Sequence, residues 1–94
     1  MNATVVGLVT PHVLAIVDLA RQAEGGVNVD WHLRDAVARS MDALGHHYNA
    51  RDLMEAYLQG LEAAAQEAGR FRTMYAAALR SAATIAARDP KLRD

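Results

Sequence analysis

The chain of 94 residues contains no cysteine, two prolines and only five aromatic residues. Without cysteine it can form neither a disulfide framework nor a thiolate zinc site. The apolar stretch 3–9 lacks the basic residues that open a signal peptide. No apolar run reaches the roughly 18–20 residues that a membrane-spanning helix needs. These absences predict a soluble, cytoplasmic protein without a membrane partner.

Recognised motifs of catalysis and nucleotide binding are also missing. The sequence has no Gly-x-Ser-x-Gly, no phosphate-binding loop and no dinucleotide fingerprint. Carboxylates such as Asp52 and Glu55 fall on the polar side of a predicted helix, and no nucleophile stands where it would pair with a base. We therefore expect a protein that is not an enzyme and that uses no cofactor.

The size and composition predict a single helical domain over residues 1–94. Apolar residues make up 52% of the chain, which excludes a disordered protein, but many of them are alanines. Alanine favours helix and buries little area. A chain this small buries roughly 60–65% of its unfolded surface, so a partner would add needed stability.

Helix-breaking residues delimit the first predicted helix. Thr10 can cap a helix and Pro11 is tolerated in its first turn, which predicts a helix over 11–24. Gly25-Gly26 would end it, because glycine accepts the left-handed conformation that closes a helix. Residues 1–10 are then expected to form an N-terminal arm, either extended or helical, packed on a neighbour.

A second helix is predicted between Asp30, its expected cap, and Gly45, which ends it. Its apolar residues recur at helical spacing: Leu33, Val37, Met41 and Leu44. A third helix is predicted to begin at Asn49, where Asn49 and Asp52 resemble a capping box.

The strongest pattern is an apolar stripe that repeats every seven positions over 54–85. Its spacings of three and four place it on one face of a helix; its members are Met54, Tyr57, Leu61, Ala64, Ala68, Phe71, Tyr75, Ala78, Ala82 and Ile85. The phase continues across Gly69, which predicts one helix over about 50–88 and a solvated tail at 90–94. A break near Gly69, giving four helices, is the alternative.

A continuous helix over 50–88 would be roughly 58 Å long, whereas each shorter helix would reach only about 21 Å. The predicted fold is therefore an all-α bundle of three, or four, helices completed by a second copy. The ten residues of the stripe are its predicted homodimer interface. Residues 1–69 hold four Arg against nine Asp and Glu, whereas 70–94 hold six Arg and Lys against two Asp, which favours antiparallel pairing.

These features predict a protein–protein interaction module that acts as an adaptor, a chaperone-like factor or an inhibitor of a larger regulatory protein. The alternative is a nucleic-acid-associated regulator that uses the basic segment 70–93, with a contact patch of Arg70, Arg72, Arg80 and Arg88. A second alternative is a metal- or ligand-binding bundle around His46-His47. Zinc needs three or four ligands, so we assign no metal site.

Overall fold

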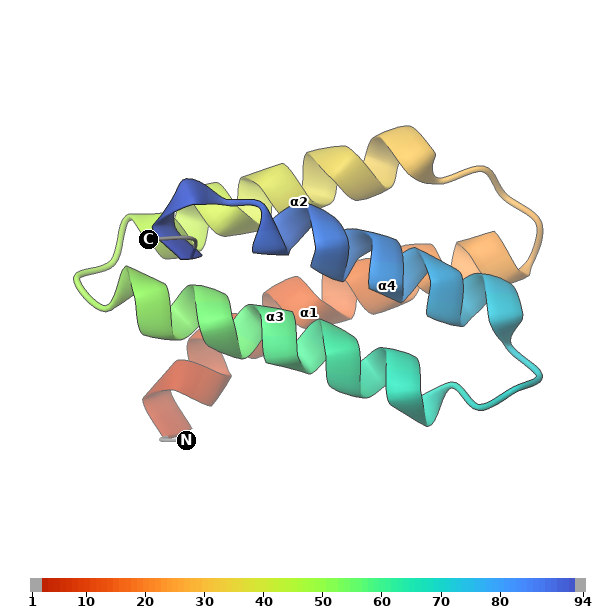
Figure 1. Cartoon of the computed structure of the whole chain (residues 1–94), viewed down its shortest axis with the longest axis horizontal. Coiled ribbons are helices and arrows are strands. Elements are labelled where there is room, and N and C mark those ends of the chain that lie inside the picture. The colour runs from red at the N-terminus through yellow and green to blue at the C-terminus, as the bar shows by residue number, and fades with distance from the viewer. Residues whose placement is uncertain (1–2, 93–94) are drawn as a thin grey trace.

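The computed structural model describes residues 3–92, which form an all-α bundle (Figure 1). Its elements are α1 (Ala3–Glu24), α2 (Asp30–Gly45), α3 (Ala50–Glu67), α4 (Thr73–Ala87) and the 3-10 helix η1 (Pro90–Leu92). Successive helices run in opposite directions and are joined by short loops. The molecule measures 38 × 25 × 21 Å. The prediction of an all-α bundle is confirmed, with four helices as in the alternative.

The predicted continuous helix over 50–88 is wrong, because the chain turns back at Gly69. This residue has a φ of +70°, in the left-handed region that glycine adopts without strain. The turn lays α4 antiparallel against α3 and buries Tyr75 and Leu79. The burial gained by folding back outweighs the few helical hydrogen bonds that an uninterrupted helix would add.

The predicted helix start at Thr10 is also wrong, since α1 begins at Ala3 and contains Pro11. Proline has no N–H to donate to the carbonyl of Gly7. One residue earlier, the Thr10 hydroxyl donates to the carbonyl of Val6 at 2.7 Å. Figure 1 shows the first turns of α1 bent away from the axis of the rest. Of the two forms considered for the N-terminal arm, it takes the helical one.

The other helix ends lie close to their predicted positions, although the capping differs. Gly26, with a φ of +96°, follows α1 as expected. Val29 rather than Asp30 occupies the N-cap of α2, and the Asp30 N–H donates to the Asn28 side chain at 3.1 Å. Asn49 is the N-cap of α3, but its side chain makes no capping hydrogen bond.

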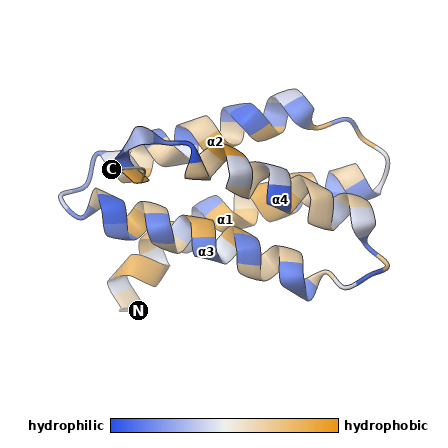
Figure 2. Cartoon of the chain, in the orientation of Figure 1, coloured by the Kyte–Doolittle hydropathy of each residue, from blue (hydrophilic) through white to orange (hydrophobic). Residues whose placement is uncertain are grey.

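All four helices contribute buried apolar residues to one core, and hydrophobic and hydrophilic residues alternate along the helices (Figure 2). Helices α1, α3 and α4 pack most closely, and α2 packs less extensively on all three. The C-terminal segment is attached to this core, in contrast to the solvated tail expected at 90–94. Leu92 packs partly against the core, and the Lys91 ammonium donates to the Gly45 carbonyl at 3.0 Å. Residues 93 and 94 lie outside the described residues.

Candidate interaction surface

The apolar stripe predicted as a dimer interface is covered mainly by helices of the same chain. Seven of its residues are buried: Met54, Tyr57, Leu61, Ala68, Tyr75, Ala78 and Ala82. Ala64 and Ile85 are partly buried against the core, whereas Phe71, in the turn between α3 and α4, is 90% exposed. The stripe therefore needs no second copy to cover it, and the homodimer stays a prediction.

A different apolar surface is open, in a groove of about 350 Å³ between α1 and α3. None of its lining residues is ionisable: Val6, Val9, Thr10, Val13, Leu14, Ala56, Gln59, Gly60 and Ala63. Val6 is 45% exposed and Leu14 is 58% exposed. Large apolar side chains thus remain accessible to a partner along one wall of this groove.

Both walls of the groove follow from local sequence. Helix α1 carries no Asp, Glu, Lys or Arg before Asp18, so its exposed side is neutral over most of its length. Helix α3 contributes small residues at Ala56, Gly60 and Ala63, which leave room between the helices. The groove was not predicted, because residues 1–10 were assigned to a separate arm; the absence of charge over 3–17 was the available signal.

The far side of α3 gives the groove an acidic edge. Glu55 and Glu62 lie one turn before and one turn after Gln59, which lines the groove, and Asp52 lies one turn before Ala56. Glu55 is paired with Arg51 at 3.0 Å. The groove therefore has a neutral edge on α1 and a predominantly acidic edge on α3.

Within residues 3–92, α1 is the one helix long and apolar enough to cross a membrane by length and composition alone. Core helices of soluble proteins meet the same criterion. In this fold Ile16, Val17 and Ala20 of α1 are buried against the other helices. The inward side of α1 is thus occupied by the bundle, and only its outer side is available to a lipid surface or a partner.

A polar cluster lies inside the bundle where α1, α2 and α3 meet. His12 Nδ1 lies 3.0 Å from the Ser40 hydroxyl, and the His12 ring meets the Tyr57 ring edge-on at 6.4 Å. Burial raises the pKa of Tyr57 to about 12, and the neighbouring Ser40 hydroxyl lowers it only in part. The Tyr57 hydroxyl has no hydrogen-bond partner of good geometry among the described residues, so Ser40 is its neighbour and not its partner.

The histidines are distributed over separate parts of the fold. His46 follows α2 at its C-terminal end and donates through Nδ1 to the Asp42 carbonyl at 2.6 Å. His32 packs edge-on against Trp31 at the opposite end of α2. Across residues 3–92, no three His, Cys, Asp or Glu side chains come together in a group that could hold a metal ion.

The predicted basic patch is spread along the whole length of α4, with Arg80 at the middle of the helix. Arg70 and Arg72 lie in the turn before this helix, where the Arg72 guanidinium stacks 4.3 Å from the centroid of the Tyr75 ring. Arg88 lies just after the helix, which is about 22 Å long for its 15 residues. The four arginines therefore do not form one compact patch.

The α1–α3 groove thus combines accessible apolar side chains with an acidic edge on α3 and a neutral edge on α1. Comparisons of the chain with models of protein families, with curated proteins and with solved structures found no match.

Proposed function

We propose that this protein is a non-enzymatic interaction module that binds the apolar face of a partner helix in the α1–α3 groove. The observation that supports the proposal is the groove itself, whose lining contains no ionisable residue and whose wall exposes Val6 and Leu14. Exposed apolar surface with polar edges is typical of protein interaction sites. A groove between two helices suits the recognition mode in which a partner helix inserts apolar anchors.

The charges beside the groove define the chemistry of the partner. Asp52, Glu55 and Glu62 make the α3 edge acidic, whereas the α1 edge carries no charge before Asp18. A complementary helix would carry Lys or Arg along one side of its apolar face, where these side chains approach the α3 carboxylates. A helix with Asp or Glu in those positions would meet like charge and bind more weakly.

The action of such a module follows from the surface that it covers. A bundle that occupies the apolar face of another protein's helix prevents that face from pairing elsewhere. An inhibitor, a chaperone-like factor and an adaptor could all act in this way. They differ in what the partner does after it is released.

The test uses the full chain and two designed amphipathic peptides with the same apolar face. One peptide carries Lys beside that face and the other carries Glu. We expect the basic peptide to shift the backbone amide resonances of α1 and α3 around Leu14 and Ala63, with at least tenfold higher affinity than the acidic one. Equal binding of both peptides, or shifts confined to other helices, would contradict the proposal.

Substitutions in the groove test whether the peptide binds at this surface. Leu14→Asp and Ala63→Arg each introduce a charge at an exposed position of the groove, and we expect both to abolish peptide binding while the helical circular dichroism is retained. Val27→Asp is the matched control, because Val27 is also half-exposed but lies in the loop between α1 and α2. Peptide binding that survives both groove variants would exclude this surface.

Two further measurements test whether the groove binds a second copy of the chain or a lipid surface instead of a partner helix. Light scattering of the protein alone would show a second copy as a dimer that Leu14→Asp disrupts. Sedimentation with lipid vesicles would show a membrane surface as the occupant. If either result were obtained and neither peptide bound, the proposal that the groove binds a partner helix would be wrong.

A further inference from the structure

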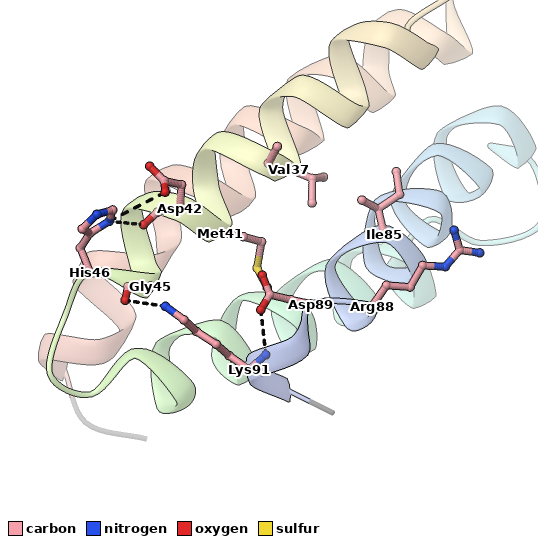
Figure 3. A pocket seen from close by; sticks show the side chains of 10 residues that line it. Val37, Met41, Asp42, Gly45, His46, Ile85, Arg88, Asp89 and Lys91 are labelled. Atoms are coloured by element: carbon pink, nitrogen blue, oxygen red, sulfur yellow. Dashed lines mark hydrogen bonds and ion pairs between the residues drawn. The ribbon is translucent and has the colours of Figure 1, made fainter. Parts of the chain in front are cut away.

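A second cleft lies between α2 and α4 and shares no residue with the α1–α3 groove. Its larger part has a volume of about 630 Å³ and its smaller part about 410 Å³. Ile85 and Arg88 line both parts, so the two parts adjoin at these side chains. Figure 3 shows the larger part, which η1 closes at one end.

Apolar side chains form the floor of the larger part. Val37 of α2 lies across the cleft from Ile85 of α4, and the Met41 side chain ends near Asp89 (Figure 3). Val37 and Met41 are buried at the bottom, and Ile85 is half-buried. This floor can receive a short hydrocarbon chain without displacing a charged group.

Asp89 and Lys91, two of the charged residues that line the larger part, already have hydrogen-bond partners, and Asp42 lies near His46. The Asp42 carboxylate lies 4.0 Å from His46 Nδ1, and the Asp89 carboxylate accepts from the Lys91 N–H at 2.9 Å. The Lys91 ammonium donates to the Gly45 carbonyl. The hydrogen bond from Lys91 to Gly45 joins η1 to the C-terminal end of α2, and the floor beside it is apolar.

The smaller part, by contrast, is lined by two arginines and by no acidic residue. Arg34 of α2 and Arg88 after α4 both line it, and neither has a carboxylate within 4.0 Å among residues 3–92. The hydroxyl-bearing residues Ser81 and Thr84 lie between them on α4. Two cations at one cavity repel each other, and an anion between them removes that repulsion. Guanidinium groups bind carboxylate and phosphate through paired, charge-assisted hydrogen bonds.

We propose that this cleft binds a small amphiphile with one anionic head group, either a carboxylate or a phosphate monoester. The head lies between Arg34 and Arg88, and the apolar chain lies over Val37, Met41 and Ile85. This inference does not depend on the proposed function, since the two sites have separate linings. The proposal rests on two observations: both arginines line the smaller part, and the apolar floor lies in the larger part next to it.

The test is a calorimetric titration of the full chain with ligands that differ in one feature at a time. Octanoate and octyl phosphate carry both head and chain, octanol lacks the charge, and acetate and inorganic phosphate lack the chain. We expect either or both of the complete amphiphiles to bind at least tenfold more tightly than the corresponding fragments. The stronger of the two identifies the head group. Equal affinity for octanol, or for inorganic phosphate and acetate, would overturn the proposal.

Substitutions locate the head group. We expect Arg34→Gln and Arg88→Gln each to weaken binding about tenfold, the size expected when one charge-assisted hydrogen-bonding partner is lost. Arg39→Gln is the matched control, because Arg39 is also an exposed arginine of α2 but is paired with Asp35 at 3.0 Å. Unchanged affinity in both cleft variants, or amide shifts at the α1–α3 groove instead, would contradict the assignment.

Discussion

Val13 of α1 lies directly over Gly60 of α3: a β-carbon at position 60 would stand 2.9 Å from Val13 Cγ2. Alanine would gain about 1 kcal/mol in helix propensity there. It would also overpack the contact, which typically costs about 1–3 kcal/mol, because a valine in a helix has one strongly preferred rotamer. We expect Gly60→Ala to destabilise the fold by about 1 kcal/mol in urea denaturation. In a Val13→Ala background the same change should stabilise it; stabilisation with Val13 present would show that the two helices separate freely.

A second prediction concerns the turn that separates α3 from α4. Nothing lies within 4 Å of a β-carbon at Gly69, so only its φ of +70° opposes substitution. Gly69→Ala should therefore cost about 1–2 kcal/mol, the penalty for a left-handed alanine. Gly7, which is helical and equally unobstructed, is the control, and Gly7→Ala should stabilise the protein by up to about 1 kcal/mol. Similar melting-temperature shifts in both variants would argue for an unbroken helix through residue 69.

A third prediction compares two members of the apolar stripe, Leu61 and Phe71. Leu61 is fully buried, so Leu61→Ala should destabilise the fold by about 2–5 kcal/mol through lost burial and a residual cavity. Phe71 is 90% exposed, and Phe71→Ala should change stability by no more than about 0.5 kcal/mol. Guanidinium unfolding at several protein concentrations measures both effects. A large, concentration-dependent loss on replacing Phe71 would instead indicate that the stripe is completed by a second copy.

A fourth prediction follows from the raised pKa of Tyr57, which is about 12 in the folded protein against an ordinary value of 10.0. The folded state keeps this proton when the unfolded state has lost it. Stability from this group is therefore intact below pH 10 and declines as the pH rises from 10 through 12. The full loss amounts to about 2–3 kcal/mol. Denaturation midpoints measured between pH 9 and 12 should show this decline.

Tyr57→Phe should remove that alkaline component. At pH 7 it should leave stability unchanged or raise it by about 1 kcal/mol, because it deletes a buried hydroxyl without a hydrogen-bond partner among the described residues. Tyr48→Phe is the control, since Tyr48 is fully exposed and its loss should not alter the pH profile. If the Tyr57 variant still lost stability between pH 10 and 12 to the same extent, that loss would come from other groups.

The helix class and most element boundaries could be predicted from the sequence because they depend on local residues. Gly25-Gly26 and Gly45 stand at or beside the ends of α1 and α2, as expected. The long helix was predicted wrongly because α3 and α4 each bury their own face, and the turn between them happens to preserve the seven-residue phase. A seven-residue repeat that continues in phase is therefore compatible both with one long helix and with two shorter helices that each bury one face.

The candidate sites depended on contacts between distant segments, which the sequence does not display. The α1–α3 groove needs α1 to continue through Pro11, and local rules place a proline at the start of a helix. Arg34 and Arg88 line one cavity only if α2 and α4 lie side by side, and in the sequence these residues are separated by α3, α4 and two loops. Neither site could be located before the order and packing of the four helices were known.

Pro11 also divides α1 into two parts with different local stability. The missing N–H leaves the Gly7 carbonyl without its helical partner, so fewer hydrogen bonds join the first turns to the rest. Those turns supply Val6 and Val9 to the groove, and segments with fewer bonds open more often than the bundle as a whole. One wall of the groove should therefore exchange its amide hydrogens faster than residues 12–24, and a bound helix should slow that exchange by selecting the closed population.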